Sequence, residues 1–353
     1  MQIARYVTNM IDITLIIRTG IPGVRLSTST IQRISSKGIS LPRCICLLLL
    51  VASGYASRPT FAQVNRPEFS ASDVVLDARS AALQASGLEG EVSVGFGGLI
   101  NAAAMLQVTD VWQVALSHVN HLDAVQQNAV VVYSPSQWRI GLHHLSWGEL
   151  DRRDATNDEL GTFRAQELII SGGKSYPLTP SVSVGALAHG QYSQLAEARA
   201  ARVLLDAALR FQSADRRTRI TVQGRVASPS VASQLPVARA AGALEFGASS
   251  QLRYLPLRVH ARYRPLGWQS AGPATSPIQD IRLGGELYLG EAMVLRLGYS
   301  FFQHDQLAVR SRLDFAGTGI GLGIRLKRAI VDYGSMSWSD SGRVHVFTIR
   351  LRR

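Results

Sequence analysis

The chain has 353 residues, of which 46% are hydrophobic and 18% charged, and no run approaches the ~20 apolar residues that a membrane-spanning helix needs. Its formal net charge is +12, but residues 1–62 hold seven basic residues and one acidic residue, so the remainder has 30 basic and 24 acidic residues, a net charge of +6. These basic residues are mostly dispersed arginines, which argues against a nucleic-acid-binding patch. Because Cys44 and Cys46 are the only cysteines, residues 63–353 contain no intrachain disulfide, cysteine nucleophile or cysteine-ligated zinc.

Residues 1–62 are predicted to be a leader that ends in a secretory signal peptide. Arg43 precedes the short apolar run Cys44 to Ala52, and small residues follow it. A basic flank, a short apolar core and small residues before the cut are typical of such a signal, with cleavage after Ala62 or Ala56. Residues before about 38 are interpreted as the product of a mis-called start codon, since this leader is long for a signal peptide. A buried strand at 44–52 is the alternative.

Residues 63–353 are expected to form one domain that begins with a short helical stretch. Asp77 is a suitable N-cap for the small-residue segment that runs from Ala78 to Leu83. Inside a barrel this segment would act as an N-terminal plug, and otherwise it would be a surface turn of helix. The sequence leaves both interpretations open.

From residue 91 onward the chain reads as a series of β-strands. Apolar and polar residues alternate with a period of two, and Ser/Pro turns separate the segments, as in hairpins. The expected strands are 92–96, 112–119, 129–133, 137–143, 163–172, 181–189, 202–211, 219–227 and 257–264. Three polar stretches, at 148–162, 228–236 and 265–279, are expected to be long loops.

The strongest alternation lies in the C-terminal block, from residue 281 to residue 351. One face of each segment is aliphatic and aromatic, and the other is rich in Gly, Arg and Glu. Roughly 20 residues per strand and connection predict about 14 strands and a transmembrane antiparallel β-barrel. The residues expected to face its lumen are Arg282, Glu286, Arg296 and Arg325. A soluble β-sandwich with its arginine face in water is the alternative fold.

No catalytic, cofactor or metal site is expected. The stretch Ser171-Gly-Gly-Lys174 matches Ser-x-x-Lys but lacks the accompanying Lys-Thr-Gly element and a helix start. His143 and His144 fall on opposite faces of a strand, so they cannot chelate one metal ion. The acidic residues of the first long loop do not have EF-hand spacing, and a solvated loop is the simpler interpretation. They are Glu149, Asp151, Asp154, Asp158 and Glu159.

Short motifs that keep their order over about residues 70–351 carry a family resemblance. They are Asn101-Ala-Ala, Leu160-Gly-Thr-Phe163, 185–195, Leu252-Arg-Tyr-Leu-Pro-Leu-Arg258, 279–287, 295–299, 319–327, 331–334 and 345–349. On these stretches the chain resembles the PorV/PorQ family of type IX secretion outer-membrane barrels, which is related to the FadL-type fold. It departs from the family pattern at Ala102, at His189 and at residues 83–85.

This resemblance implies a non-enzymatic outer-membrane protein that anchors a PorZ-like partner at the cell surface. The partner complex would include PorU- and PorV-like proteins that fix secreted cargo to lipopolysaccharide. On that interpretation the loops at 148–162 and 265–279, including the five acidic residues above, would dock the partner. The alternative on the same fold is a FadL-type transporter of hydrophobic small molecules, against which the Arg, Gln, Glu and His residues of the lumen face argue.

Overall fold

The computed structural model describes residues 75–88, 111–121, 125–154, 156–233, 241–266, 281–307, 315–338 and 342–352. The predicted signal peptide, the expected strand at 92–96 and nearly all of the expected loop at 265–279 lie outside these residues. No helix among the described residues is long and apolar enough to cross a membrane.

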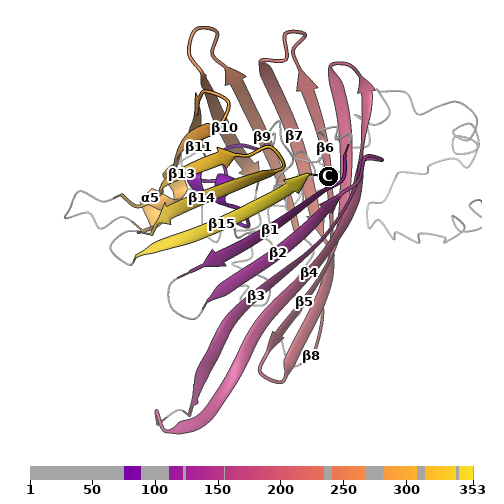
Figure 1. The fold of residues 1–353 in the computed structure, drawn as a ribbon. Coiled ribbons are helices and arrows are strands. Elements are labelled where there is room, and N and C mark those ends of the chain that lie inside the picture. The colour runs from indigo at the N-terminus through magenta and orange to yellow at the C-terminus, as the bar shows by residue number, and fades with distance from the viewer. Residues whose placement is uncertain are drawn as a thin grey trace, which may run out of the picture. The chain divides into compact units, whose positions relative to one another are not determined.

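The described chain is dominated by strands that follow one another along the sequence (Figure 1). Two short helices accompany them, α3 (Ala78–Ala82) and α5 (Phe301–Leu307). The strands are β1 (Gln113–Asn120), β2 (Gln126–Tyr133), β3 (Trp138–Arg153), β4 (Glu159–Thr179), β5 (Val182–Leu195), β6 (Ala198–Gln212), β7 (Thr218–Ala227), β8 (Val231–Ser233), β9 (Ala241–Gln251), β10 (Leu257–Leu266), β11 (Ile281–Leu289), β12 (Met293–Ser300), β13 (Thr318–Arg325), β14 (Ala329–Ser337) and β15 (Arg343–Arg352).

The strands close into an antiparallel barrel. Each long strand pairs with its neighbours, and β1 pairs with β15 from Gln113↔Arg352 to Asn120↔His345, which joins the two ends of the sheet. The short strand β8 adds only a three-residue pairing to β6, so fourteen of the fifteen strands make the wall. The predicted strand number and the predicted barrel are confirmed.

The two ends of the barrel differ in the length of their connections. At one end, here called the short-turn end, consecutive strands are joined by the segments 134–137, 180–181, 213–217, 252–256, 290–292 and 326–328. The opposite end, here called the long-loop end, carries the longest connections, 228–240, 267–280 and 301–317. This asymmetry is typical of outer-membrane barrels, in which short turns face the periplasm.

The two faces of the wall differ in polarity, as the alternation predicts. Large apolar side chains point outward, and Leu297 is 62% exposed, whereas Glu286 on the inward face is 0% exposed. A soluble protein has the opposite distribution, with apolar side chains inside and charges in water. The exposed apolar face and the closed ring therefore exclude the soluble β-sandwich and indicate a wall in contact with lipid.

Aromatic and polar side chains mark the edges of this outer apolar band. Near the short-turn end the ammonium group of Lys174 lies 5.0 Å from the centre of the Trp138 ring and 4.8 Å from that of Tyr176. Toward the long-loop end, outward-facing His118 and Asn128 are hydrogen-bonded at 2.9 Å. Aromatic girdles of this kind flank the lipid-facing band of membrane barrels.

The predicted loop at 148–162 is wrong. The structure continues β3 to Arg153 and begins β4 at Glu159, so most of this polar stretch is a hairpin. Strand β5 pairs with β4 only from Ala165 onward, which leaves the hairpin two-stranded beyond the barrel rim (Figure 1). The stretch was predicted to be a loop because it is polar. Both faces of a projecting hairpin lie in water, so its strands do not need alternating apolar residues.

Candidate functional site: the plugged lumen

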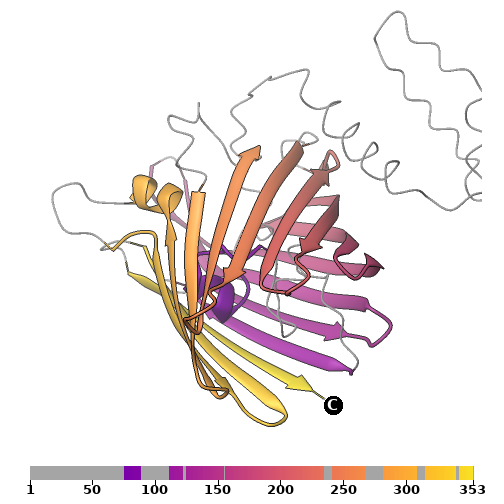
Figure 2. The same ribbon diagram turned by 90° about the horizontal axis from the view of Figure 1, so that it is seen from above.

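Helix α3 lies inside the ring of strands when the barrel is seen from above (Figure 2). Its N-cap is Asp77, as predicted, and the Asp77 carboxylate accepts hydrogen bonds from Ser80 N at 2.8 Å and from Ser80 Oγ at 2.7 Å. The backbone N–H of Ala78 donates to Thr348 Oγ1 of β15 at 3.0 Å. Strand β15 therefore satisfies one of the amide groups that a helix start leaves free, and α3, here called the plug, is attached to the inner face of the wall.

The wall makes room for this plug with glycines on its inward face. A Cβ at Gly319 would lie 2.5 Å from the carbonyl oxygen of Ala81, and a Cβ at Gly298 would lie 2.6 Å from Leu83 Cα. A Cβ at Gly334 would overlap the carbonyl group of Ala78. These atoms belong to the backbone of the plug, so glycine is needed here for close approach of the two chains.

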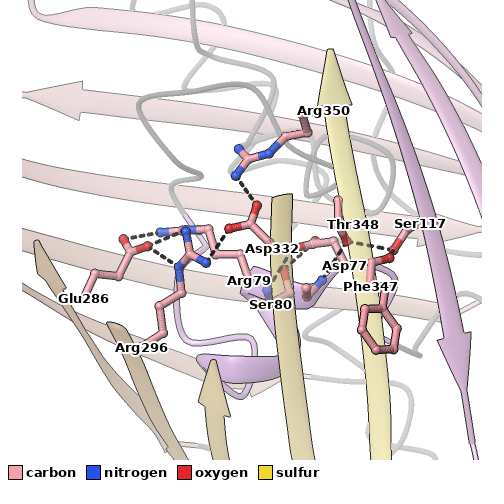
Figure 3. A network of polar contacts seen from close by, with 11 residues as sticks. Asp77, Arg79, Ser80, Ser117, Glu286, Arg296, Asp332, Phe347, Thr348 and Arg350 are labelled. Carbon is pink, nitrogen blue, oxygen red and sulfur yellow. Dashed lines mark hydrogen bonds and ion pairs between the residues drawn. The ribbon is translucent and has the colours of Figure 1, made fainter. Parts of the chain in front are cut away.

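A chain of buried ion pairs joins the plug to the wall (Figure 3). Arg79 of α3 donates from Nε to Glu286 Oε1 at 2.9 Å and from Nη2 to Glu286 Oε2 at 2.8 Å. The same carboxylate accepts from Arg296 Nε at 3.0 Å and from His260 Nε2 at 3.0 Å. Arg296 Nη1 also donates to Asp332 Oδ1 at 2.6 Å, and Arg350 donates to the other oxygen of Asp332.

Glu286 is the centre of this network because it receives hydrogen bonds from α3, β10 and β12 at once. Bidentate arginine–carboxylate pairs are strong and directional. Removing one partner of a buried pair leaves the other charge uncompensated, at a cost of about 3–5 kcal/mol. The ion pair between Arg79 and Glu286, here called the lock, therefore stabilises the position of α3 against the wall.

The structure places the four residues expected in the lumen on the inward face. Glu286 and Arg296 meet in the network, and Arg282 Nη1 donates to the carbonyl oxygen of Gln84, just after the plug helix, at 3.4 Å. Arg325 lies apart at the short-turn end, with its guanidinium 5.3 Å from the centre of the Tyr288 ring.

Sequence reasoning missed the remaining members of the network, Arg79, His260, Asp332 and Arg350. His260, Asp332 and Arg350 occupy inward positions of alternating strands, so strand parity could have identified them. Arg79 lies in the plug, and no local pattern relates it to Glu286, which is 207 residues away in the sequence.

The five acidic residues proposed for docking lie on the β3–β4 hairpin and the turn between its strands. Glu149 pairs with Arg164 at 2.7 Å and Glu159 with Arg153 at 2.6 Å, and Asp151 lies 3.8 Å from Arg153. In the turn, the Asp154 carboxylate accepts hydrogen bonds from Thr156 Oγ1 at 2.7 Å and from the Asp158 amide at 2.9 Å. The hydrogen bond from Thr156 and then that from Asp158 lower the pKa of Asp154 below its ordinary value. The contacts of these carboxylates therefore lie within the hairpin and its turn.

Among the described residues, no group of three or more His, Cys, Asp or Glu side chains is arranged to hold a metal ion. The Ser171 hydroxyl of the Ser-x-x-Lys stretch lies in the middle of β4, where it is hydrogen-bonded to His189 Nδ1 of β5 at 2.7 Å.

Comparison with known proteins found no matching family model and no matching curated protein. Among solved structures, the chain is similar to the Pseudomonas putida toluene transporter TodX, at 13% identity and a TM-score of 0.47, covering 78% of this chain and 96% of TodX. It is also similar to the monoaromatic hydrocarbon channel CymD, at 12% identity and a TM-score of 0.48, covering 79% of this chain and 98% of CymD. A Pseudomonas aeruginosa FadL homologue matches at 10% identity and a TM-score of 0.47, covering 78% of this chain and 97% of the homologue. The barrel of this chain is established independently by its own strand pairing.

Proposed function

We propose that the protein is an outer-membrane transporter of the FadL type, a barrel that passes small molecules when the α3 plug leaves its seat. The observation that carries this proposal is α3 itself, which lies in the lumen and is held there by hydrogen bonds and ion pairs and by no covalent bond to the wall. The apolar outer band and the short-turn end support an outer-membrane location with the short turns in the periplasm.

The size of the ring supports a transport role. The interior of an eight-stranded barrel is filled by its own side chains, whereas barrels of 16–18 strands enclose an aqueous channel. A ring of fourteen strands is close to the second class, so its lumen needs a plug in order to stay closed. No disulfide holds this plug, since residues 63–353 contain no cysteine.

The composition of the lumen indicates which solutes fit. Buried Arg, Gln, Ser and Thr side chains line the inward face, between smaller clusters of apolar residues. A plain hydrocarbon would leave those polar groups without hydrogen bonds, at a cost of about 1–3 kcal/mol for each group. The wall therefore favours amphiphilic solutes, which carry a polar group, over plain hydrocarbons.

Replacing residues 76–88 with a Gly/Ser linker of equal length is expected to raise the single-channel conductance in planar bilayers several-fold. The linker has neither Arg79 nor the helix that occupies the lumen. Heat-modifiable mobility on a gel is the control that the wall still folds. A folded barrel whose conductance equals that of the wild type would contradict the proposed function.

A second candidate function, the anchoring of a PorZ-like partner in the type IX attachment complex, is favoured by the β3–β4 hairpin. This hairpin projects beyond the rim at the long-loop end and exposes Trp147 and Leu160 next to its ion pairs. Exposed apolar side chains rimmed by charged residues are typical of protein-binding surfaces.

Deleting residues 149–160 is expected to abolish retention of such a partner on the cell surface, because the projecting part of the hairpin is removed. Surface immunolabelling of cells would measure the retention. The substitution Glu291→Ala, in the exposed turn 290–292 at the short-turn end, is the control and should retain the partner. Unchanged retention after the deletion would eliminate the hairpin as the docking element.

A further inference from the structure

A groove lies on the outer face of the wall, where β15 and β1 close the barrel. Its volume is about 420 Å³, within the range of about 300–1,000 Å³ that is usual for ligand sites. We call it the outer groove, and its apolar lining consists of Leu116, Val130, Leu142, Phe347 and Ile349. Because the hydrocarbon core of a bilayer holds no water, a groove in the lipid-facing band must be filled by a lipid chain or by protein.

The outward side chains of β15, β1, β2 and β3 become polar row by row toward the long-loop end. Strand pairing defines three such rows. The first row is wholly apolar and consists of Ile349, Leu116, Val130 and Leu142. The second consists of Phe347, His118, Asn128 and His144, and the third of His345, Asn120, Gln126 and Ser146. This change from apolar to polar indicates the boundary between acyl chains and headgroups.

Hydrogen bonds join the polar side chains of these rows across the strands. His118 Nδ1 donates to Asn128 Oδ1 at 2.9 Å, and His144 Nε2 donates to Gln166 Oε1 of β4 at 3.3 Å. Gln166 Nε2 donates in turn to Gln194 Oε1 of β5 at 3.3 Å. Polar groups in hydrocarbon cost free energy, so a ladder of amides and imidazoles on the outer face suits the zone in which lipid headgroups offer hydrogen-bond partners.

A guanidinium group lies beyond the third row. Arg343 is the first residue of β15, two residues from His345 on the same outward face, and it is exposed. Its register partner on β14 is the uncharged Ser337. From the outer groove to the rim, the wall thus presents an apolar slot, neutral hydrogen-bonding groups and a cation that suits a phosphate. An amphiphile whose acyl chain is followed by sugar and phosphate groups has the complementary order.

The direction of this order selects the leaflet of the membrane. The polar rows lie between the outer groove and the long-loop end, which faces the cell exterior when the short turns face the periplasm. A lipid of the outer leaflet has its chains and its headgroup in the same direction, whereas a lipid of the inner leaflet has them reversed. The outer leaflet of an outer membrane consists of lipopolysaccharide, whose lipid A part carries acyl chains, glucosamine and phosphate.

We propose that the outer groove binds the lipid A part of lipopolysaccharide. One acyl chain lies in the groove beside Phe347, the sugar contacts His118 and Asn128, and a phosphate contacts Arg343. The site is on the outside of the barrel, so it is separate from the lumen and does not depend on the passage of solutes. Because the groove spans β15 and β1, the bound chain covers the seam at which the sheet closes.

Native mass spectrometry of the full-length barrel in a neutral detergent tests this proposal, with diphosphoryl lipid A as the probe. We expect saturable binding of one lipid A molecule per barrel. Dioleoyl phosphatidylglycerol, which is anionic but has no sugar, is the comparison lipid. It should bind about tenfold more weakly, because it cannot replace the hydrogen bonds of the sugar.

The Leu116→Trp variant fills the outer groove with an indole ring and is expected to weaken lipid A binding about tenfold, since the acyl chain loses its packing contacts. Leu295→Trp places the same side chain on the outer face of β12, away from the groove, and is the matched control. Leu116 is 49% exposed and Leu295 is 42% exposed, so neither change disturbs the lumen. Heat-modifiable mobility verifies that both variants are folded.

The Arg343→Gln variant tests the phosphate contact. It should weaken the binding of diphosphoryl lipid A about two- to fivefold, because an exposed ion pair contributes little free energy. Arg328→Gln, which removes an exposed arginine from the turn 326–328 at the short-turn end, is the control and should bind as the wild type does.

Absence of lipid A binding, or equal affinity of the wild type and Leu116→Trp, would overturn the proposal. Phosphatidylglycerol that binds as tightly as lipid A would overturn the assignment to lipopolysaccharide. A dimer that Leu116→Trp dissociates would also overturn it, because a second copy of the chain would then cover the groove. These outcomes are independent of the conductance of the linker variant, which tests the transporter alone.

Discussion

Replacing Glu286 with glutamine is expected to lower the free energy of unfolding of the barrel by about 3–5 kcal/mol and to increase the frequency of channel opening. Glu286 is fully buried and accepts from Arg79, Arg296 and His260. The amide keeps the size of the side chain but removes the charge that compensates two guanidinium groups. Urea titration in lipid vesicles measures the stability, and single-channel recording measures the opening.

The matched control for this substitution is Glu149→Gln on the hairpin. The Glu149–Arg164 pair is also an arginine–carboxylate pair, but its side chains are 58% and 77% exposed, so its loss should cost about 0–1 kcal/mol. A double-mutant cycle with Arg79→Ala separates the plug contact from the rest of the network, since the two substitutions should be strongly non-additive. If Glu286→Gln and Glu149→Gln changed the free energy of unfolding and the frequency of opening equally, the Arg79–Glu286 ion pair would not be what holds the plug.

Substituting Gly298 with valine is expected to displace the plug while the wall stays intact. A Cβ at this position would lie 2.6 Å from both the Cα and the carbonyl oxygen of Leu83, and backbone atoms of the plug cannot yield as a flexible side chain can. Valine is favourable in a strand, so β12 itself is not weakened. We expect conductance close to that of the linker variant, measured in the same bilayer recordings.

Gly190→Val in β5 is the control, because no atom lies within 4 Å of a Cβ built at Gly190 and the residue faces outward. It should leave both conductance and heat-modifiable mobility unchanged. If the Gly298→Val variant had the conductance of the wild type, the plug would accommodate the valine side chain without moving. That result would count against the close fit of plug and wall.

The wall of the barrel could be predicted from the sequence because the alternation of side chains that produces it is a local property of each strand. A strand in a membrane barrel must present apolar side chains to lipid and polar ones to the lumen, and this requirement produces a period of two that is readable from Ile281 to Leu289. The N-cap at Asp77 was readable for the same reason, since it depends only on the next few residues. The hairpin at 149–164 could not be predicted in this way, because neither of its faces contacts lipid or the lumen and no alternation is required there.

The sequence by itself therefore determined a closed wall with an apolar outside, a polar inside and about fourteen strands. Only the tertiary structure decided what fills the lumen and which charges meet there. Arg79 and Glu286 are 207 residues apart, and they meet because the ring closes around α3 and the inward glycines let the two backbones approach. Pairing at such separations depends on closure of the whole sheet, and no local pattern in the chain specifies it.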